Sequence, residues 1–173
     1  MQKIIINQNN LSETDITEIV KRVKILLINS NNEILLAYSH HNYQFPGGHV
    51  EDDESLLQTV KREILEETGI DLATIDIEPF ACTMGYYKDW PEKGKNRKTE
   101  IYYYEIKTDE KPNLDNTSYS EHEKDGNFEL RYIPLDTVED ELRKNVEIYS
   151  DAFGITKEML MLFTLYKSGL EKI

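Results

Sequence analysis

The chain has 173 residues, which is enough for one domain with a substantial core and too few for two domains of ordinary size. Its apolar content of 39% suits a globular protein, and no run approaches the roughly 20 consecutive apolar residues that a membrane-spanning helix needs. With 33 acidic against 20 basic residues, the net charge of −13 disfavours a nucleic-acid partner, whose phosphates demand a basic surface. Cys82 is the single cysteine, so a reducing cytoplasm is the expected compartment.

The first part of the chain predicts a short strand and then a β-hairpin. Residues 3–6 read KIII and predict a short β segment, and residues 12–14 have the character of a helix start. Residues 23–29 and 33–38 are apolar, β-branched runs, and the Ser-Asn-Asn turn at residues 30–32 separates them. The Pro-Gly-Gly sequence that follows at positions 46 to 48 predicts a loop.

Residues 54–67 predict a helix. Asp52 or Asp53 can serve as its N-cap, and Gly69 lies where a glycine commonly ends a helix. The apolar residues of this segment recur at i, i+3 and i+7, which gives a stripe that faces a core. They are Leu57, Val60 and Ile64.

The second half of the chain predicts three strands and a terminal helix. The strands are expected at residues 75–87, 99–107 and 128–133, with a basic loop at 88–98 and a long loop at 108–126. Residues 157–170 have apolar side chains at helical spacing. Together the elements predict one α/β domain, of the α+β kind, in which helices flank a mixed sheet.

Three carboxylates gather along one edge of the predicted helix. Glu67 lies four residues after Glu63, and Glu66 lies three after it, so the three are neighbours on a helix. Like charges at these spacings destabilise a helix by tenths of a kcal/mol per pair, and hard divalent cations, which prefer oxygen ligands, would offset that cost. Arg62 can hold the Glu66 carboxylate. The plain alternative is an exposed helix face with solvated charges.

The residues around these carboxylates favour the metal site. Residues 48–70 read GHVEDDESLLQTVKREILEETGI and resemble the Nudix box, G-x5-E-x7-R-E-U-x-E-E-x-G-U, where U is a bulky apolar residue. All seven literal positions and both apolar ones match, and a chance match in a chain this long is roughly one in ten million from average residue usage. The preceding Phe-Pro-Gly is also similar to the usual approach to the box. Asp53 stands where members often have glycine, which we expect to alter the loop and not the chemistry.

The resemblance implies a Nudix fold, a mixed β-sheet sandwiched between helices, over residues 20–173, with residues 1–19 as an N-terminal extension packed on it. It also implies a hydrolase that uses Mg²⁺ or Mn²⁺ to cleave a phosphoanhydride bond. The implied partner is a small nucleoside-diphosphate-linked substrate: a nucleoside triphosphate, a nucleotide sugar, ADP-ribose or a dinucleoside polyphosphate. A homodimer stays open.

The resemblance assigns roles within the box as well. The carboxylates of Glu63, Glu66 and Glu67 are implied metal ligands, and the Gly47 carbonyl is a further one. The implied supports, which orient those carboxylates, complete the catalytic set. They are Arg62 and Glu54.

The base that takes a proton from the attacking water is a separate question. In this family it is a box glutamate or a carboxylate of a later loop, and within the box we choose Glu63. Outside it, Glu121 and Glu123 are the candidates, although a solvated acid is the more ordinary role in so acidic a loop.

Aromatic and basic residues after the box are candidates for substrate binding. Tyr86, Tyr87 and Trp90 could stack on a nucleobase, or the tyrosines could be ordinary β-strand packing. The cations of the following segment could meet a polyphosphate or form a solvated loop. They are Lys88, Lys93, Lys95, Arg97 and Lys98.

Two functions of other classes compete with hydrolysis. A Nudix-like regulatory module would bind a nucleotide without turnover, and the intact box disfavours it. An isomerase of isoprenoid diphosphates would need a catalytic cysteine, for which Cys82, on a predicted strand, is a poor candidate. Within the hydrolases, messenger-RNA decapping is disfavoured by the charge of −13.

Overall fold

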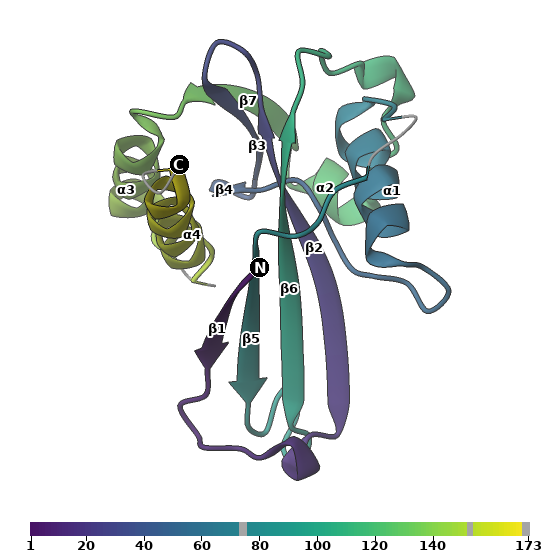
Figure 1. Cartoon of the computed structure of the whole chain (residues 1–173), viewed down its shortest axis with the longest axis vertical. Helices are drawn as coiled ribbons and strands as arrows, with labels where there is room; N and C mark the ends of the chain where they lie inside the picture. The colour runs from purple at the N-terminus through teal and green to yellow at the C-terminus, as the bar shows by residue number, and fades with distance from the viewer. Residues whose placement is uncertain (73–75, 152–153, 171–173) are drawn as a thin grey trace.

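The computed structural model describes residues 1–72, 76–151 and 154–170. A twisted seven-stranded sheet runs through the molecule, with helices on both of its faces (Figure 1). Six strands follow one another in the order β1 (Gln2–Ile6), β5 (Ala81–Tyr87), β6 (Arg97–Lys107), β2 (Glu18–Ile28), β3 (Glu33–Ser39) and β4 (Asn42–Gln44). The seventh, β7 (Glu129–Pro134), pairs with β3.

The sheet is mixed, as predicted. β2 pairs in parallel with β6 and β1 in parallel with β5, whereas β5 pairs antiparallel with β6. The β2–β6 ladder runs from Glu18 opposite Arg97 to Ile28 opposite Lys107, and this pairing makes both strands longer than their apolar runs predict. The predicted α+β class with flanking helices is confirmed.

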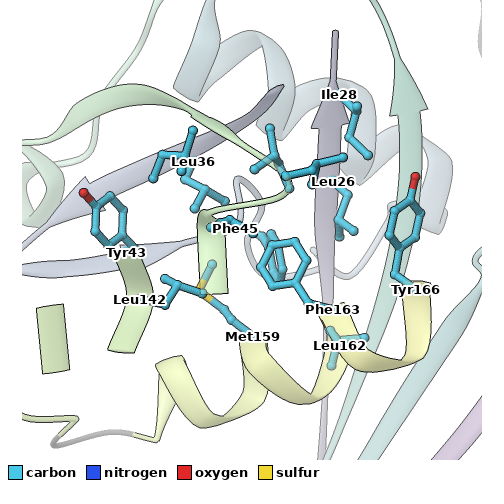
Figure 2. Packing of buried hydrophobic residues seen from close by; sticks show 14 of the residues in the cluster. Leu26, Ile28, Leu36, Tyr43, Phe45, Leu142, Met159, Leu162, Phe163 and Tyr166 are labelled. Atoms are coloured by element: carbon cyan, nitrogen blue, oxygen red, sulfur yellow. The ribbon is translucent and has the colours of Figure 1, made fainter. Parts of the chain in front are cut away.

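Four helices complete the fold: α1 (Leu56–Thr68), α2 (Glu121–Asp125), α3 (Val138–Tyr149) and α4 (Ile155–Leu170). α1 and α2 lie on one side of the sheet, and α3 and α4 lie on the other (Figure 1). Because successive side chains of a strand point to opposite faces, β2 contributes to both cores. Val23 and Ile25 pack with α1, whereas Leu26 packs under α4. Figure 2 shows Leu26 near Phe163, and Leu142 beside Met159, in the α3–α4 core.

On the edge of β2 that faces away from β6, the first part of the strand has a loop for a neighbour instead of a strand. β3 pairs with β2 only near its end, where Leu27 and Ile28 have partners. Below that point, the amide of Ile25 donates to the Pro46 carbonyl at 2.9 Å, and the amide of Val23 donates to the Gly48 carbonyl at 3.0 Å. The loop that opens the box is therefore held along the edge of β2.

The start of α1 differs from the prediction. Ser55, not Asp52 or Asp53, is the N-cap: its hydroxyl accepts from the Gln58 amide, and its own amide donates to the Gln58 side chain at 2.8 Å. A serine with a glutamine three residues later forms this reciprocal capping box. Gly69 ends the helix with φ +69°, and a Cβ there would lie 1.9 Å from the Asn113 carbonyl oxygen.

Several elements depart from the sequence-based expectation. The strand expected at residues 75–87 begins at Ala81; Ile75 lies outside the described residues, and Pro79 has no N–H for a ladder bond. The loop expected at residues 108–126 contains α2 and a 3₁₀ turn. α3 has no predicted counterpart, because Asn145 interrupts its apolar stripe; that side chain donates to the His41 carbonyl at 2.8 Å.

The C-terminal helix is confirmed, and so is the placement of Cys82 on a strand. The 12–14 segment forms a single 3₁₀ turn at Glu13–Asp15, which Ser12 caps. None of the described helices is long and apolar enough to cross a membrane.

Candidate active site

The loop before α1, one edge of α1 and the start of α2 surround a cavity of about 460 Å³, here named the box cavity. Five of the residues predicted for the site line it: Gly47, Arg62, Glu63, Glu66 and Glu67. Its other lining residues come from the box loop and from the segment that leads into α2: Gly48, His49, Glu51, Ser118, Tyr119, Ser120 and Glu123.

Arg62 is the centre of the ionic contacts in the box. Its Nε and Nη2 donate to the two oxygens of Glu54 at 2.7 and 2.9 Å. Its Nη1 donates to Glu63 at 2.8 Å and to Glu66 at 3.0 Å. The guanidinium holds the pKa of Glu54 at about 2, well below its usual range. One cation thus fixes three carboxylates, and Glu54 in turn fixes Arg62.

Glu67 and Glu63 are the buried carboxylates of the cavity. Their residues are 5% and 8% exposed. Burial raises the pKa of Glu67, and the negative charges of Glu63 and Glu123 act in the same direction. Burial also raises the pKa of Glu63, against the opposing effect of Arg62. Two carboxylates in so dry a place need a cation or a proton to offset their charge.

The glycines of the loop allow its close approach to both β2 and α1. A Cβ at Gly48 would lie 2.3 Å from a carboxylate oxygen of Glu63. Gly47 has φ +131°, a conformation that residues with side chains rarely adopt, and a Cβ there would lie 2.3 Å from the Val23 carbonyl oxygen. Its amide donates to Glu67 at 3.3 Å.

The donor chemistry of the box cavity fits a hard divalent cation. Gly47 and the three glutamates line one space, and carboxylate and carbonyl oxygens are ligands that Mg²⁺ prefers. In the arrangement observed, Glu63 and Glu66 turn toward Arg62, and no three His, Cys, Asp or Glu side chains of the described residues converge as a metal cluster.

The two candidate bases outside the box lie in different environments. Glu123 lines the box cavity, and its carboxylate accepts from the Ser120 amide at the start of α2. The side chain of Glu121 is fully exposed and lies 3.8 Å from Lys124. Only Glu123 of this pair faces the box carboxylates.

The three aromatic candidates for substrate binding lie in three different places. Tyr87 lines a second cavity, of about 390 Å³, here named the α4 cavity, between the β5–β6 surface and the start of α4. Tyr86 points to the other face of the sheet, and its hydroxyl donates to Glu13. Trp90 lies in the β5–β6 loop, is 56% exposed and lines neither cavity.

Three of the cations at residues 88–98 that were considered for phosphate binding form ion pairs with acidic residues of the chain itself. Lys95 pairs with Glu92 at 2.8 Å. Arg97 and Lys98 belong to β6 and not to a loop; Arg97 pairs with Glu18 at 2.8 Å, and Lys98 pairs with Glu13 at 2.9 Å. These contacts favour a structural role for those three residues, although Lys98 is buried and not part of a solvated loop.

Two cations of β2 that the sequence analysis does not single out lie beside the box cavity. Lys24 Nζ donates to the carbonyls of Phe45 and Gly47 at 3.0 and 3.2 Å. Arg22 donates through Nε to His49 Nε2 at 3.0 Å. The signal that could have found them is the alternation R-V-K-I, which places two cations on one face of an otherwise apolar strand.

Comparisons with solved structures show what the fold is similar to. A MutT protein from Bacillus halodurans is 22% identical, with a TM-score of 0.50 over 70% of this chain and 72% of that one. An Ap4A hydrolase from C. elegans is 19% identical, with a TM-score of 0.54 over 89% and 99%. A MutT protein from Methanosarcina mazei Go1 is 19% identical, with a TM-score of 0.53 over 87% and 96%. At these identities the likeness concerns the fold.

None of the curated proteins matches the sequence. Among protein-family models, the NUDIX domain matches residues 19–153, which is well over half of the chain and includes the whole box. The chain therefore belongs to the NUDIX domain family, and it is an enzyme of the Nudix pyrophosphohydrolase type.

Proposed function

We propose that the protein hydrolyses a phosphoanhydride bond in a small nucleoside-diphosphate-linked substrate, with Mg²⁺ or Mn²⁺ as its cofactor. The observation that carries the proposal is the box cavity, which Gly47 and three glutamates line together and in which Arg62 contacts two of the carboxylates. We assign the metal to Gly47, Glu63, Glu66 and Glu67. A bound divalent ion there would neutralise phosphate charge and lower the pKa of a water molecule.

The other residues of the site have supporting tasks in this proposal. Arg62 and Glu54 keep the carboxylates in place, so that little reorganisation is needed when substrate arrives. Lys24 and Arg22 supply positive charge on the α4 side of the loop, where the phosphates of a bound substrate would otherwise meet an acidic protein.

We assign the proton transfer from water to Glu63, because its carboxylate lines the box cavity beside the other assigned metal ligands. Glu123 is the alternative, since it is the loop carboxylate that faces the same cavity. Glu121 makes a matched control for Glu123 because it lies on the same short helix with its side chain in solvent.

The substrate is open among four classes: nucleoside triphosphates, nucleotide sugars, ADP-ribose and dinucleoside polyphosphates. The structures compared above are of MutT proteins and an Ap4A hydrolase, which makes triphosphates and dinucleoside polyphosphates the first classes to assay. Identification of products by chromatography, in Mg²⁺, in Mn²⁺ and in excess EDTA, tests the proposal. We expect that one of the four substrate classes is cleaved and that its cleavage requires Mg²⁺ or Mn²⁺. Full activity in EDTA, or binding without cleavage of any class, would contradict it, and the second result would favour a regulatory module.

A further inference from the structure

The α4 cavity has the size and composition of a small-molecule site. Its volume of about 390 Å³ falls within the roughly 300–1,000 Å³ of typical ligand pockets. Its floor is the β5–β6 surface, with the hydroxyls of Thr83 and Thr99 and the apolar side chain of Ile101. Ile6 of β1 lies on one side, and Glu158 and Met161 of α4 lie on the other.

Tyr87 gives this cavity an aromatic surface. A Cβ at Gly85 would lie 2.6 Å from the Tyr87 hydroxyl and 2.7 Å from its ring, so the ring lies back over the glycine, against the strand. The residue is 44% exposed although it lines a cavity, which leaves part of the ring accessible to a ligand. Flat aromatic surfaces of this kind stack on any nucleobase.

Glu158 is the acidic side chain of the cavity, and a hydrogen bond from the sheet holds it in place. Its Oε1 accepts a hydrogen bond of 2.7 Å from the hydroxyl of Tyr103, which is fully buried. The Tyr103 hydroxyl also lies 3.2 Å from the Thr83 hydroxyl. Lys157 lines the same cavity, but Glu158 has no ion pair among the described residues, so its second oxygen can accept from a ligand.

Arg22 and Lys24 lie on one face of β2, the strand that pairs with β6 of the α4 cavity floor. Lys24 contacts the Gly47 carbonyl, and Arg22 contacts His49, which lines the box cavity. On the other side, Arg22 is the register partner of Ile101, which lines the α4 cavity. A phosphate chain that starts in the box cavity would thus pass two positive charges before its nucleoside reaches the α4 cavity.

We propose that the α4 cavity holds the nucleobase of the substrate and that Glu158 selects a base with two adjacent N–H donors, as guanine presents at N1 and its 2-amino group. A carboxylate is an acceptor only, so it pairs with two donors side by side. Adenine places the lone pair of N1 beside its amino group, and hypoxanthine lacks the 2-amino group. The inference rests on the proposed function for the phosphate end of the substrate and adds the class of base.

The experiment is isothermal titration of the full chain with GMP, IMP and AMP in EDTA. These ligands contain no phosphoanhydride bond, so binding is read without hydrolysis. Because a hydrogen bond to a charged group contributes roughly 1.5–3 kcal/mol, GMP should bind at least about 10-fold more tightly than IMP or AMP. Glu158→Gln should reduce the affinity for GMP to that for IMP, since the amide still accepts from Tyr103 and turns its NH₂ toward the base.

Glu105→Gln is the matched control. Glu105 also accepts a tyrosine hydrogen bond, from Tyr166 at 2.8 Å, and it lies outside the α4 cavity. That variant should retain the preference for GMP. Equal affinities for the three nucleotides, no binding at millimolar concentrations, or an unchanged preference in Glu158→Gln would each overturn the inference. If the preference is found and no substrate is cleaved, the proposed hydrolysis fails and the assignment of the α4 cavity stands.

Discussion

Glu63, Glu66 and Glu67 come from one helix, yet they lie in different environments. The side chain of Glu66 is 39% exposed and that of Glu63 is 10% exposed, and both contact Arg62. Glu67 is more deeply buried and accepts from the Gly47 amide. A divalent ion would therefore relieve the most electrostatic strain at Glu67, and the loss of that carboxylate should matter most.

The first prediction concerns Glu67→Gln. The amide keeps the shape and can still accept from Gly47, but it removes one charge and one strong oxygen ligand. Turnover should fall by at least about 10²-fold, as expected when metal positioning fails. The melting temperature without metal should not fall, because a buried carboxylate with like-charged neighbours has become neutral. Steady-state kinetics and calorimetry measure both, with Glu121→Gln as the control. Wild-type turnover in Glu67→Gln would contradict the assignment of the box.

The second prediction uses the adjacent tyrosines of β5. Tyr87→Ala should raise KM by roughly 10-fold, because base–aromatic stacking contributes about 1–3 kcal/mol. Tyr86→Ala should leave KM unchanged, since that ring faces the other side of the sheet and contacts Glu13. The two substitutions remove the same atoms one residue apart. Equal effects on KM would show that the α4 cavity does not contact the substrate.

At the scale of the element, Arg62 and Glu54 tie the box loop to α1. Both oxygens of Glu54 contact the guanidinium, and one of them also accepts from Thr59 at 2.9 Å. The contact spans eight residues, so it fastens the segment before the N-cap to the middle of the helix. The loop that supplies Gly47 then keeps its position relative to the carboxylates of α1.

The third prediction tests this tie by its dependence on pH. The pKa of Glu54 in the folded protein, about 2, lies below its ordinary value of 4.5. The ionised carboxylate therefore stabilises the fold above about pH 4.5, and that contribution is lost as the pH falls toward 2. Glu54→Gln should cost about 1–3 kcal/mol of unfolding free energy at neutral pH, and the difference from wild type should narrow in acid. Denaturant unfolding at several pH values measures it. If the difference in unfolding free energy between Glu54→Gln and wild type does not change with pH, the contact between Glu54 and Arg62 does not stabilise the fold as proposed. Asp52→Asn, in the same loop, is the control and should leave the unfolding free energy unchanged.

The way in which the elements bring the site residues together decides which of these residues can be predicted from the sequence alone. The box carboxylates and Arg62 are separated by a few residues on one helix, so helical geometry brings them together without knowledge of the rest of the fold. Arg22 and Glu158 reach the site through the β2–β6 ladder and the packing of α4, which are long-range and leave no local pattern. α3 was hidden for a different reason, because the buried Asn145 breaks the apolar periodicity that marks a helix.

At the scale of the whole molecule, the box cavity and the α4 cavity adjoin β2, between the two layers of helices. In a protein with a net charge of −13, Arg22 and Lys24 are two cations of β2 that contact the box loop, through His49 and Gly47. Metal at the box carboxylates would reverse the local sign of charge and allow an anionic substrate to bind to an acidic protein.

The fourth prediction is that Mg²⁺ stabilises the fold, and more so at higher pH. The pKa values of Glu63 and Glu67 are raised by burial, so the stability that comes with their neutral forms is lost as the pH rises through those values. Metal binds the ionised forms and offsets that loss, while at lower pH protons compete with it. The increase in melting temperature on adding Mg²⁺ should be larger at pH 8 than at pH 6. An increase that is equal at both, or larger at pH 6, would contradict it.

The central claim is that this chain places a water molecule in line with one phosphorus of a phosphoanhydride and activates it there. Turnover in H₂¹⁸O with Mg²⁺, followed by mass spectrometry of the products, tests it most directly. The account predicts a single ¹⁸O on one particular phosphorus, because the fixed carboxylates define the line of attack. Glu63→Gln should slow this incorporation while it weakens substrate binding much less, since activation of water matters mainly in the transition state. Tight nucleotide binding with no ¹⁸O in any product, in Mg²⁺ and in Mn²⁺, would contradict the account.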